Sequence, residues 1–179
     1  MKHKLLALGI IVLAMVAFGT TLAGAQTTAN GPYYATPSWD QTLPSSTRFI
    51  VLSNFGSAAV LDRETGLVWE RSPSTSTYIW WYAQDHCNDL ALGNRKGWGV
   101  PTQQELASLV DFTQFNPALP SGHPFTNVQV DSRYWSATTD TTNTGYAWVV
   151  DFVFGTGALT KFFELRVWCV RGGQGFDPQ

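Results

Sequence analysis

The sequence is poor in the residues that carry catalysis or bind metals. It has two cysteines and three histidines among 179 residues, and charged residues make up only 13% of the chain. It has no Cys-x-x-Cys pair and no recognisable nucleophile elbow. His86 and His123 are the only candidate bases outside the N-terminal segment. We therefore expect a protein that is not an enzyme.

The chain also has no excess of basic residues. Its formal net charge is −2, and Arg95 and Lys96 are the only adjacent basic pair after the N-terminal segment. A mildly acidic chain is a poor general binder of polyanions, because binding to a phosphate backbone depends on clustered Lys and Arg. Nucleic acid is therefore not expected as a partner.

Long apolar runs are confined to the N-terminus. Residues 1–4 are basic, residues 5–18 are apolar, and Ala23-Gly24-Ala25 is a small-residue cleavage site. This order predicts a signal peptide over residues 1–25. No later apolar run approaches the roughly 18 residues that a spanning helix needs. The expected product is exported to the periplasm, the cell surface or the medium, without a membrane span after cleavage.

The two cysteines are Cys87 and Cys169. In an oxidising compartment we expect them to pair, since disulfides persist there. The alternative is two buried free thiols, because unpaired cysteine behaves as a small apolar residue.

Composition divides the chain into four parts. The signal peptide is followed by a linker or irregular arm over residues 26–47, rich in Thr, Ser, Pro and Gly. One domain is expected over residues 48–173 and a short tail over residues 174–179. Within the domain, residues 48–54 and 57–62 are β-rich and predict a hairpin, and residues 67–70 predict a short strand.

Two helices are expected in the middle of the domain. Trp80, Ala83, Cys87 and Leu90 recur at spacings of three and four, which predicts a helix over residues 77–92 that ends at Gly93.

The second helix has a clear start signal. Thr102-Gln103-Gln104-Glu105 matches a capping box, in which the Thr side chain and the Glu side chain each accept a backbone N–H. The apolar positions that follow predict a helix over residues 103–112.

The last third of the domain is expected to contain long loops and strands. Residues 116–133 hold three prolines and predict an irregular loop. Strands are expected over residues 134–138 and 146–154, separated by the polar loop 139–145. A turn at residues 155–157 and a final strand that places Leu165, Val167 and Cys169 on one face complete the pattern. The fold class is therefore α+β, with two helices and a mainly antiparallel sheet.

Six segments in order resemble one bacterial family. LDRETGLVWE, WWYAQDHCNDL, GWGVPTQQELASLVD, YWSATT, AWVVDFVFG and VWCVRGG are similar to the motifs of the Lcl C-terminal domain family, named after a collagen-like adhesin. The resemblance implies a C-type-lectin-like fold with a disulfide from the first helix to the last strand. It also implies that loops 116–133 and 139–145 face the ligand. The chain departs from the family pattern at Gly99, where Arg is usual, and at Trp168.

Candidate ligand-binding residues are the polar side chains and one tyrosine in or beside these loops, namely His123, Asp131, Arg133, Asp140, Asn143 and Tyr146. Oxygen atoms of Asp131, Asp140 and Asn143 suit a hard cation such as calcium. However, the Glu-Pro-Asn and Trp-Asn-Asp motifs of calcium-dependent C-type lectins do not occur in the sequence, so no cofactor is expected. Of the two histidines, His86 is expected to be partly buried and His123 to be exposed.

Aromatic residues allow a binding function. Most of the tryptophans in the matched motifs, Trp69, Trp80, Trp98, Trp135 and Trp148, are expected to be core residues, whereas Tyr33, Tyr34 and Trp39 lie in the arm. We predict an adhesin-like domain that recognises a glycan or an envelope or surface protein. The alternative is a structural or assembly subunit of the envelope. The resemblance also implies a remote alternative, an enzyme related to the formylglycine-generating architecture.

Overall fold

The computed structural model describes residues 43–153 and 155–172. The predicted signal peptide, the arm up to residue 42 and the predicted tail lie outside these residues. The described part already includes Leu43, whose N–H is hydrogen-bonded to the Glu64 carboxylate, and a short helix that ends at Arg48. Contacts with the domain therefore begin before the predicted boundary at residue 48.

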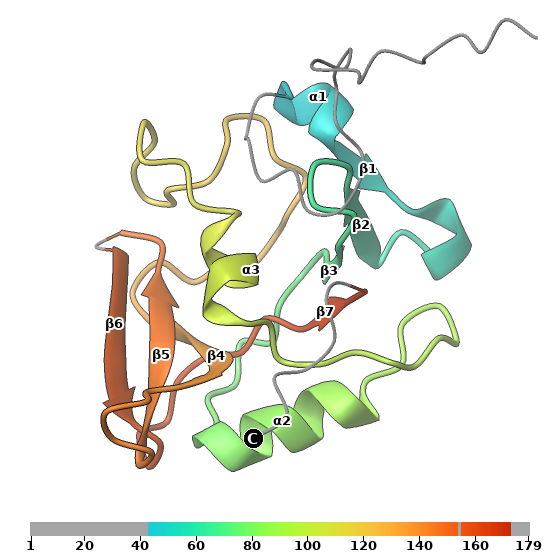
Figure 1. Ribbon diagram of the computed structural model, residues 1–179. Helices are drawn as coiled ribbons and strands as arrows, with labels where there is room; N and C mark the ends of the chain where they lie inside the picture. The colour runs from blue at the N-terminus through green and yellow to red at the C-terminus, as the bar shows by residue number, and fades with distance from the viewer. Residues whose placement is uncertain (1–42, 154, 173–179) are drawn as a thin grey trace, which may run out of the picture.

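The described residues form the predicted α+β fold with antiparallel strands, but these strands are divided between two sheets and do not form one (Figure 1). The first sheet has the strand order β1-β2-β3-β7 and the second has the order β4-β5-β6. The elements follow one another as α1 (Ser45–Arg48), β1 (Phe49–Val51), η1 (Ser53–Phe55), β2 (Ala59–Asp62), β3 (Val68–Glu70), α2 (Trp80–Asp89), α3 (Gln103–Ala107), β4 (Arg133–Thr139), β5 (Tyr146–Asp151), β6 (Gly155–Thr160) and β7 (Val170–Arg171).

The first predicted helix is present as α2, with Trp80, Ala83 and Cys87 buried. It begins at Trp80 and not at residue 77, because Tyr78 pairs with Leu165. It ends at Asp89, whose C-cap is Leu90, so the predicted end at Gly93 was wrong. Gly93 instead lies in a tight turn with φ +56°, and a side chain there would collide with the backbone of Phe55 at 2.4 Å. Glycine is needed for this close approach, and the helix ends before it.

The capping box of α3 is confirmed: Thr102 Oγ1 accepts the N–H of Glu105 and the Glu105 carboxylate accepts the N–H of Thr102. The helix ends at Ala107, however, and not near residue 112 as predicted. The Ser108 hydroxyl donates to the C=O of Glu105, and the Arg48 guanidinium donates to the C=O of Ser108. These bonds occupy carbonyls that a longer helix would use for its own N–H groups.

The predicted strand 146–154 ends early, at Asp151. The Asp151 side chain accepts the N–H of Val153, and the C=O of Phe152 accepts the N–H of Ala118, which draws the chain out of the sheet. Gly155 therefore begins β6, and the predicted turn at residues 155–157 was wrong.

The C-terminal segment connects the two sheets. The predicted final strand is reduced to β7, because the residues before it bond to separate elements: Leu165 to Tyr78, and Arg166 to β4. The predicted alternation of side chains between two faces of this segment is nevertheless present. Val167 and Cys169 belong to one core cluster, and Trp168 and Val170 belong to the other.

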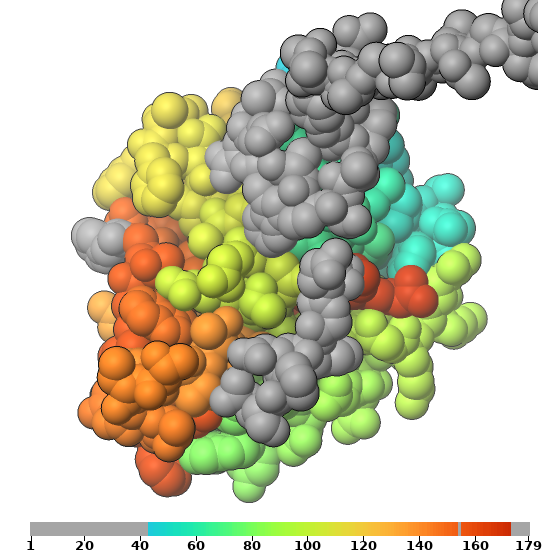
Figure 2. Space-filling model, viewed as in Figure 1, coloured from blue at the N-terminus to red at the C-terminus, as the bar shows by residue number. Residues whose placement is uncertain are grey.

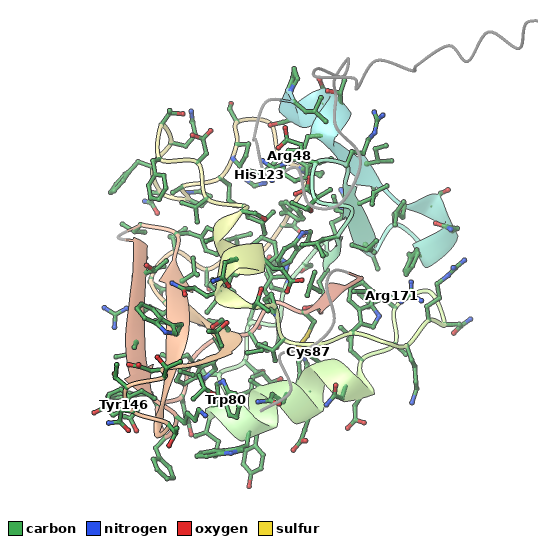
Figure 3. The ribbon with its side chains drawn as sticks, in the orientation of Figure 1. Arg48, Trp80, Cys87, His123, Tyr146 and Arg171 are labelled. Carbon is green, nitrogen blue, oxygen red and sulfur yellow. A yellow bond between two sulfur atoms is a disulfide. The ribbon has the colours of Figure 1, made fainter. Side chains whose placement is uncertain are left out.

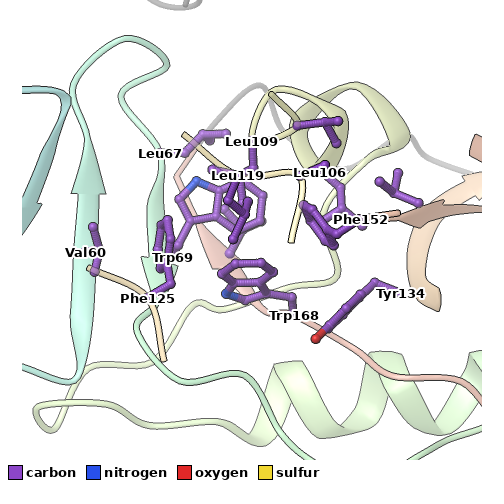
Figure 4. Packing of buried hydrophobic residues seen from close by; sticks show 14 of the residues in the cluster. Val60, Leu67, Trp69, Leu106, Leu109, Leu119, Phe125, Tyr134, Phe152 and Trp168 are labelled. Carbon is purple, nitrogen blue, oxygen red and sulfur yellow. The ribbon is translucent and has the colours of Figure 1, made fainter. Parts of the chain in front are cut away.

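Trp168 lies at the centre of the first core cluster (Figure 4). Its ring contacts those of Trp69, Phe125, Tyr134 and Phe152 at centroid distances of 4.9 to 5.8 Å. Its indole N–H donates to the C=O of Glu70, so the buried polar group is satisfied. Trp168, one of the two positions at which the sequence departs from the motif pattern, is therefore part of the core.

The predicted disulfide joins Cys87 on α2 to Cys169 just before β7, and both residues are fully buried. Four of the five tryptophans expected in the core are buried, namely Trp69, Trp80, Trp98 and Trp135. Trp148 is only partly buried, because its cross-strand partner on β6 is the small, partly exposed Ala158.

Candidate functional site

The six predicted ligand-binding residues lie in three separate places. His123 is in the long loop between α3 and β4, Asp131 and Arg133 are at the start of β4, and the remaining three follow the end of β4. His123 and Tyr146 lie at opposite ends of the molecule (Figure 3). The two predicted ligand-facing loops therefore do not form one common surface.

His123 is half-buried rather than exposed, which corrects the prediction. Its ring stacks on Phe125 of the first core cluster at 5.9 Å. Burial lowers the pKa of His123, because removal from water disfavours the charged imidazolium. Its ring packs on the core, and this position makes it a poor ligand contact.

Asp140, Asn143 and Tyr146 are held together by a tightly bonded loop. Asp140 Oδ1 accepts both the N–H and the hydroxyl of Thr142 at 2.8 Å, and these bonds lower the pKa of the Asp140 carboxyl. Asn143 Oδ1 accepts the N–H of Gly145, and the C=O of Asn143 accepts the N–H of Tyr146. The loop is thus ordered by its own side chains, with Asp140 ionised.

Lys161 joins this loop to α2. The backbone N–H of Lys161 donates to the C=O of Gly145, and the backbone C=O of Lys161 accepts the N–H of Trp80. Its ammonium lies 3.8 Å from the centre of the Trp80 ring and donates to Thr139 Oγ1 at 2.9 Å. Burial lowers the pKa of Lys161. One buried cation therefore fixes the position of the loop relative to the first turn of α2.

Exposed aromatic side chains surround this junction. Trp81 and Tyr82 project from α2, Phe162 and Phe163 from the turn after β6, and Tyr146 from the start of β5. Their exposed fractions run from 38% for Tyr146 to 73% for Phe162, and the Trp81 and Phe162 rings are 5.3 Å apart. We call these five residues the aromatic end.

The aromatic end and the polar loop form one corner of the molecule. The loop between β4 and β5, the turn after β6 and the start of α2 adjoin at the lower end of the space-filling view (Figure 2). Large apolar side chains gathered on a soluble protein commonly mark a binding surface. The corner combines flat aromatic faces with carboxylate and amide oxygens.

Sequence reasoning recognised Tyr146 but missed the other four members of the aromatic end. The signal for Trp81 and Tyr82 was nevertheless in the helical pattern. Once Trp80, Ala83 and Cys87 form the inward stripe, the two residues that follow Trp80 must point elsewhere. Phe162 and Phe163 carried no comparable signal, since a turn after a strand does not reveal which side chains it exposes.

Asp131 and Arg133 lie beside a second feature, two adjoining surface hollows of about 230 and 350 Å³. Both hollows are lined by Arg133 and Asp151, whose side chains approach to 3.6 Å. The smaller hollow lies over β6, and the larger one extends to Leu165.

The three residues whose oxygen atoms would suit a hard cation are divided between these places. Asp140 and Asn143 share one loop, and Asp131 lies at the other end of β4. A different group, Glu70, His86 and Cys169, has potential ligand atoms within 4.8 Å of one another. The Cys169 sulfur is in the disulfide and is not a thiolate, so this group is a poor metal site. His86 is partly buried as predicted and stacks on Tyr78.

Comparison with known families identifies the chain. The Lcl C-terminal domain model matches residues 58–171, which is more than half of the sequence. The chain belongs to the Lcl C-terminal domain family. No curated protein matches it. The aromatic end and both hollows fall within the matched residues, and Gly99, where the family pattern has Arg, pairs with Val170 through two backbone hydrogen bonds.

In the part of the chain that the structure describes, there is no helix with the length and apolar character required to cross a bilayer.

Proposed function

We propose that this member of the family is an exported, non-enzymatic domain that recognises a glycan through its aromatic end. The observation that supports the proposal is the exposed pair of Trp81 and Phe162, with ring centres 5.3 Å apart, beside the loop that carries Asp140 and Asn143. Sugar rings have apolar C–H faces that pack on aromatic rings, and their hydroxyls bond to carboxylates and amides. The corner offers both kinds of contact.

The electrostatics favour a neutral glycan. Asp140 lies in the loop, Glu164 follows the two exposed phenylalanines, and Asp85 lies on α2. The nearest cation, Lys161, is buried beneath Trp80 and bonded to Thr139. A sulfated or carboxylated sugar would be repelled by these carboxylates, because like charges repel. None of the residues named for this corner is an exposed cation that could offset the repulsion. The ligand class is therefore a glycan rich in hydroxyls.

The site is organised before any ligand arrives. The Lys161 contacts to Trp80, Thr139 and Gly145 hold α2 and the loop in fixed positions. A preorganised surface loses less conformational entropy on binding, so modest contacts suffice for useful affinity.

The test is a glycan array that contains neutral, sialylated and sulfated sugars, read with and without a chelator. We expect binding to neutral glycans that the chelator does not change. Trp81→Ala should weaken it about tenfold or more, since aromatic anchors dominate such surfaces. Phe112→Ala is the matched control, because Phe112 is 85% exposed on the loop after α3 and away from the aromatic end.

Two results would contradict the proposal. One is an array without any bound glycan, accompanied by co-purification of a defined envelope protein whose binding Trp81→Ala abolishes. That result would favour the alternative of an assembly subunit, since the same aromatic side chains could anchor a protein. The other is equal loss of glycan binding in Trp81→Ala and Phe112→Ala, which would place the site elsewhere.

A further inference from the structure

We propose that the glycan site is extended, and that an oligosaccharide runs from the aromatic end along β6 to Arg133 and Asp151. This inference rests on the proposed function and adds the size and course of the ligand. It assigns a role to the two hollows, which the aromatic end by itself does not explain.

The first step is the shared face of the second sheet. Arg133 pairs with Asp151, Asp151 with Gly155, and Val149 with Gly157. Side chains of directly paired residues project from the same side of a sheet. Most residues that line the smaller hollow belong to this face, and β6 runs along its length, with Thr156 and Ala158 of the same strand also in the lining.

The second step is the floor of this hollow. A Cβ added to Gly157 would meet nothing within 4 Å, and φ at Gly157 does not lie in the left-handed region. The glycine is therefore not required for a turn or for close packing. Its effect is to leave space open between Val149 and Leu159, which line the hollow on either side.

The third step is continuity with the aromatic end. β6 leads directly into the turn that exposes Phe162 and Phe163. Leu165 lines the larger hollow and pairs with Tyr78, which comes just before α2 and Trp81. The six residues of β6 span roughly 17 Å at the usual rise of a strand, which is room for several linked sugar rings.

The fourth step is the chemistry at the far end. Arg133 is half-exposed, and its Nε lies 3.6 Å from Asp151 Oδ2, too far for a strong hydrogen bond. Asp131 lines the larger hollow beside this pair. A guanidinium donor beside the exposed Asp131 carboxylate matches sugar hydroxyls, which both donate and accept. Leu159 and Leu165 provide apolar walls for the C–H faces between the two ends.

The experiment measures binding of neutral cello- and chito-oligosaccharides, from the monosaccharide to the hexasaccharide, by calorimetry on the full mature chain. We expect affinity to rise with ligand length in the unmodified protein. Gly157→Val should fill the hollow and weaken the hexasaccharide about tenfold, while the shortest ligands that bind keep their affinity. Ala91→Val is the control, because it also enlarges a small side chain to valine, but Ala91 is exposed and lines neither hollow.

The outcomes separate this inference from the proposed function. Loss of long-ligand affinity in Gly157→Val, with Ala91→Val unchanged and both variants equally stable to heat, supports an extended site. Affinity that does not depend on length, or equal behaviour of the two variants, overturns it while Trp81→Ala still tests the aromatic end. Failure of every oligosaccharide in the series to bind also overturns it. The proposed function survives that failure if the array contains another neutral glycan that binds and that Trp81→Ala weakens.

Discussion

The carboxylate of Glu70 accepts the backbone N–H of Cys169 at 2.8 Å and so places a titratable group directly beside the disulfide. Glu70 is 5% exposed. Burial raises its pKa to about 7, and the hydrogen bond from Cys169 opposes part of this rise.

Stability should therefore depend on the protonation of Glu70. Its folded pKa lies above the ordinary value of 4.5, so its contribution is fully present below pH 4.5 and is lost as pH rises through about 7. The loss amounts to about 3 kcal/mol at 1.4 kcal/mol per pKa unit. Glu70→Gln keeps an acceptor for Cys169 and removes the titration.

The measurement is urea unfolding of the unmodified protein and of Glu70→Gln between pH 4 and pH 8. The difference between the two curves isolates Glu70 from other groups, including His86, whose pKa burial lowers. A difference that stays constant across this range would mean that Glu70 does not titrate as described.

Removal of the disulfide should be costly, because Cys87 and Cys169 are separated by 82 residues. Closing a loop of this length restricts the unfolded chain and stabilises the fold by about 4–5 kcal/mol in the chain-entropy model. Cys87→Ala combined with Cys169→Ala should lower the free energy of unfolding by about that amount in urea titrations. Equal stability of the double variant and the oxidised protein would refute this.

Arg48 is expected to be indispensable for stability. Its guanidinium donates to both oxygens of Asp62, at 3.0 and 2.8 Å, and Glu64 lies at 3.4 Å, with all three side chains almost fully buried. Arg48→Met leaves two buried carboxylates without their cation and should cost about 3–5 kcal/mol.

Arg63→Met is the matched control for Arg48, because Arg63 is partly exposed and reaches the C=O of Thr47 only at 3.3 Å. It should change the free energy of unfolding by no more than about 0.5 kcal/mol. Thermal unfolding followed by circular dichroism distinguishes the two variants. Similar midpoints for both would show that the buried cluster is not required.

The capping box predicts a smaller effect. Thr102→Ala removes the acceptor for the N–H of Glu105 and should reduce stability by about 1 kcal/mol. Gln104→Ala, on the exposed face of the same helix, should have little effect. Chemical denaturation of the pair checks this, and an equal cost in both variants would attribute the loss to helix propensity rather than to the cap.

Local patterns in the sequence determined much of the fold. The Thr102–Glu105 capping box, the inward stripe of α2, the alternation through Cys169 and the pairing of the two cysteines were all predicted and are all present. These features depend on residues a few positions apart, or on the only cysteines in the chain, so no knowledge of distant neighbours was needed.

Tertiary structure decided where the elements end and where the surface is suited to binding. α3 is short because Arg48, distant in sequence, takes the carbonyl of Ser108, and β5 stops where Phe152 bonds to Ala118. The candidate site depends in the same way on long-range contacts. Lys161 brings Trp80 and the loop before Tyr146 together, and Trp81 meets Phe162 across eighty residues of chain. Periodicity determines which side chains leave the core, but only the packing of distant segments determines which of them share a surface.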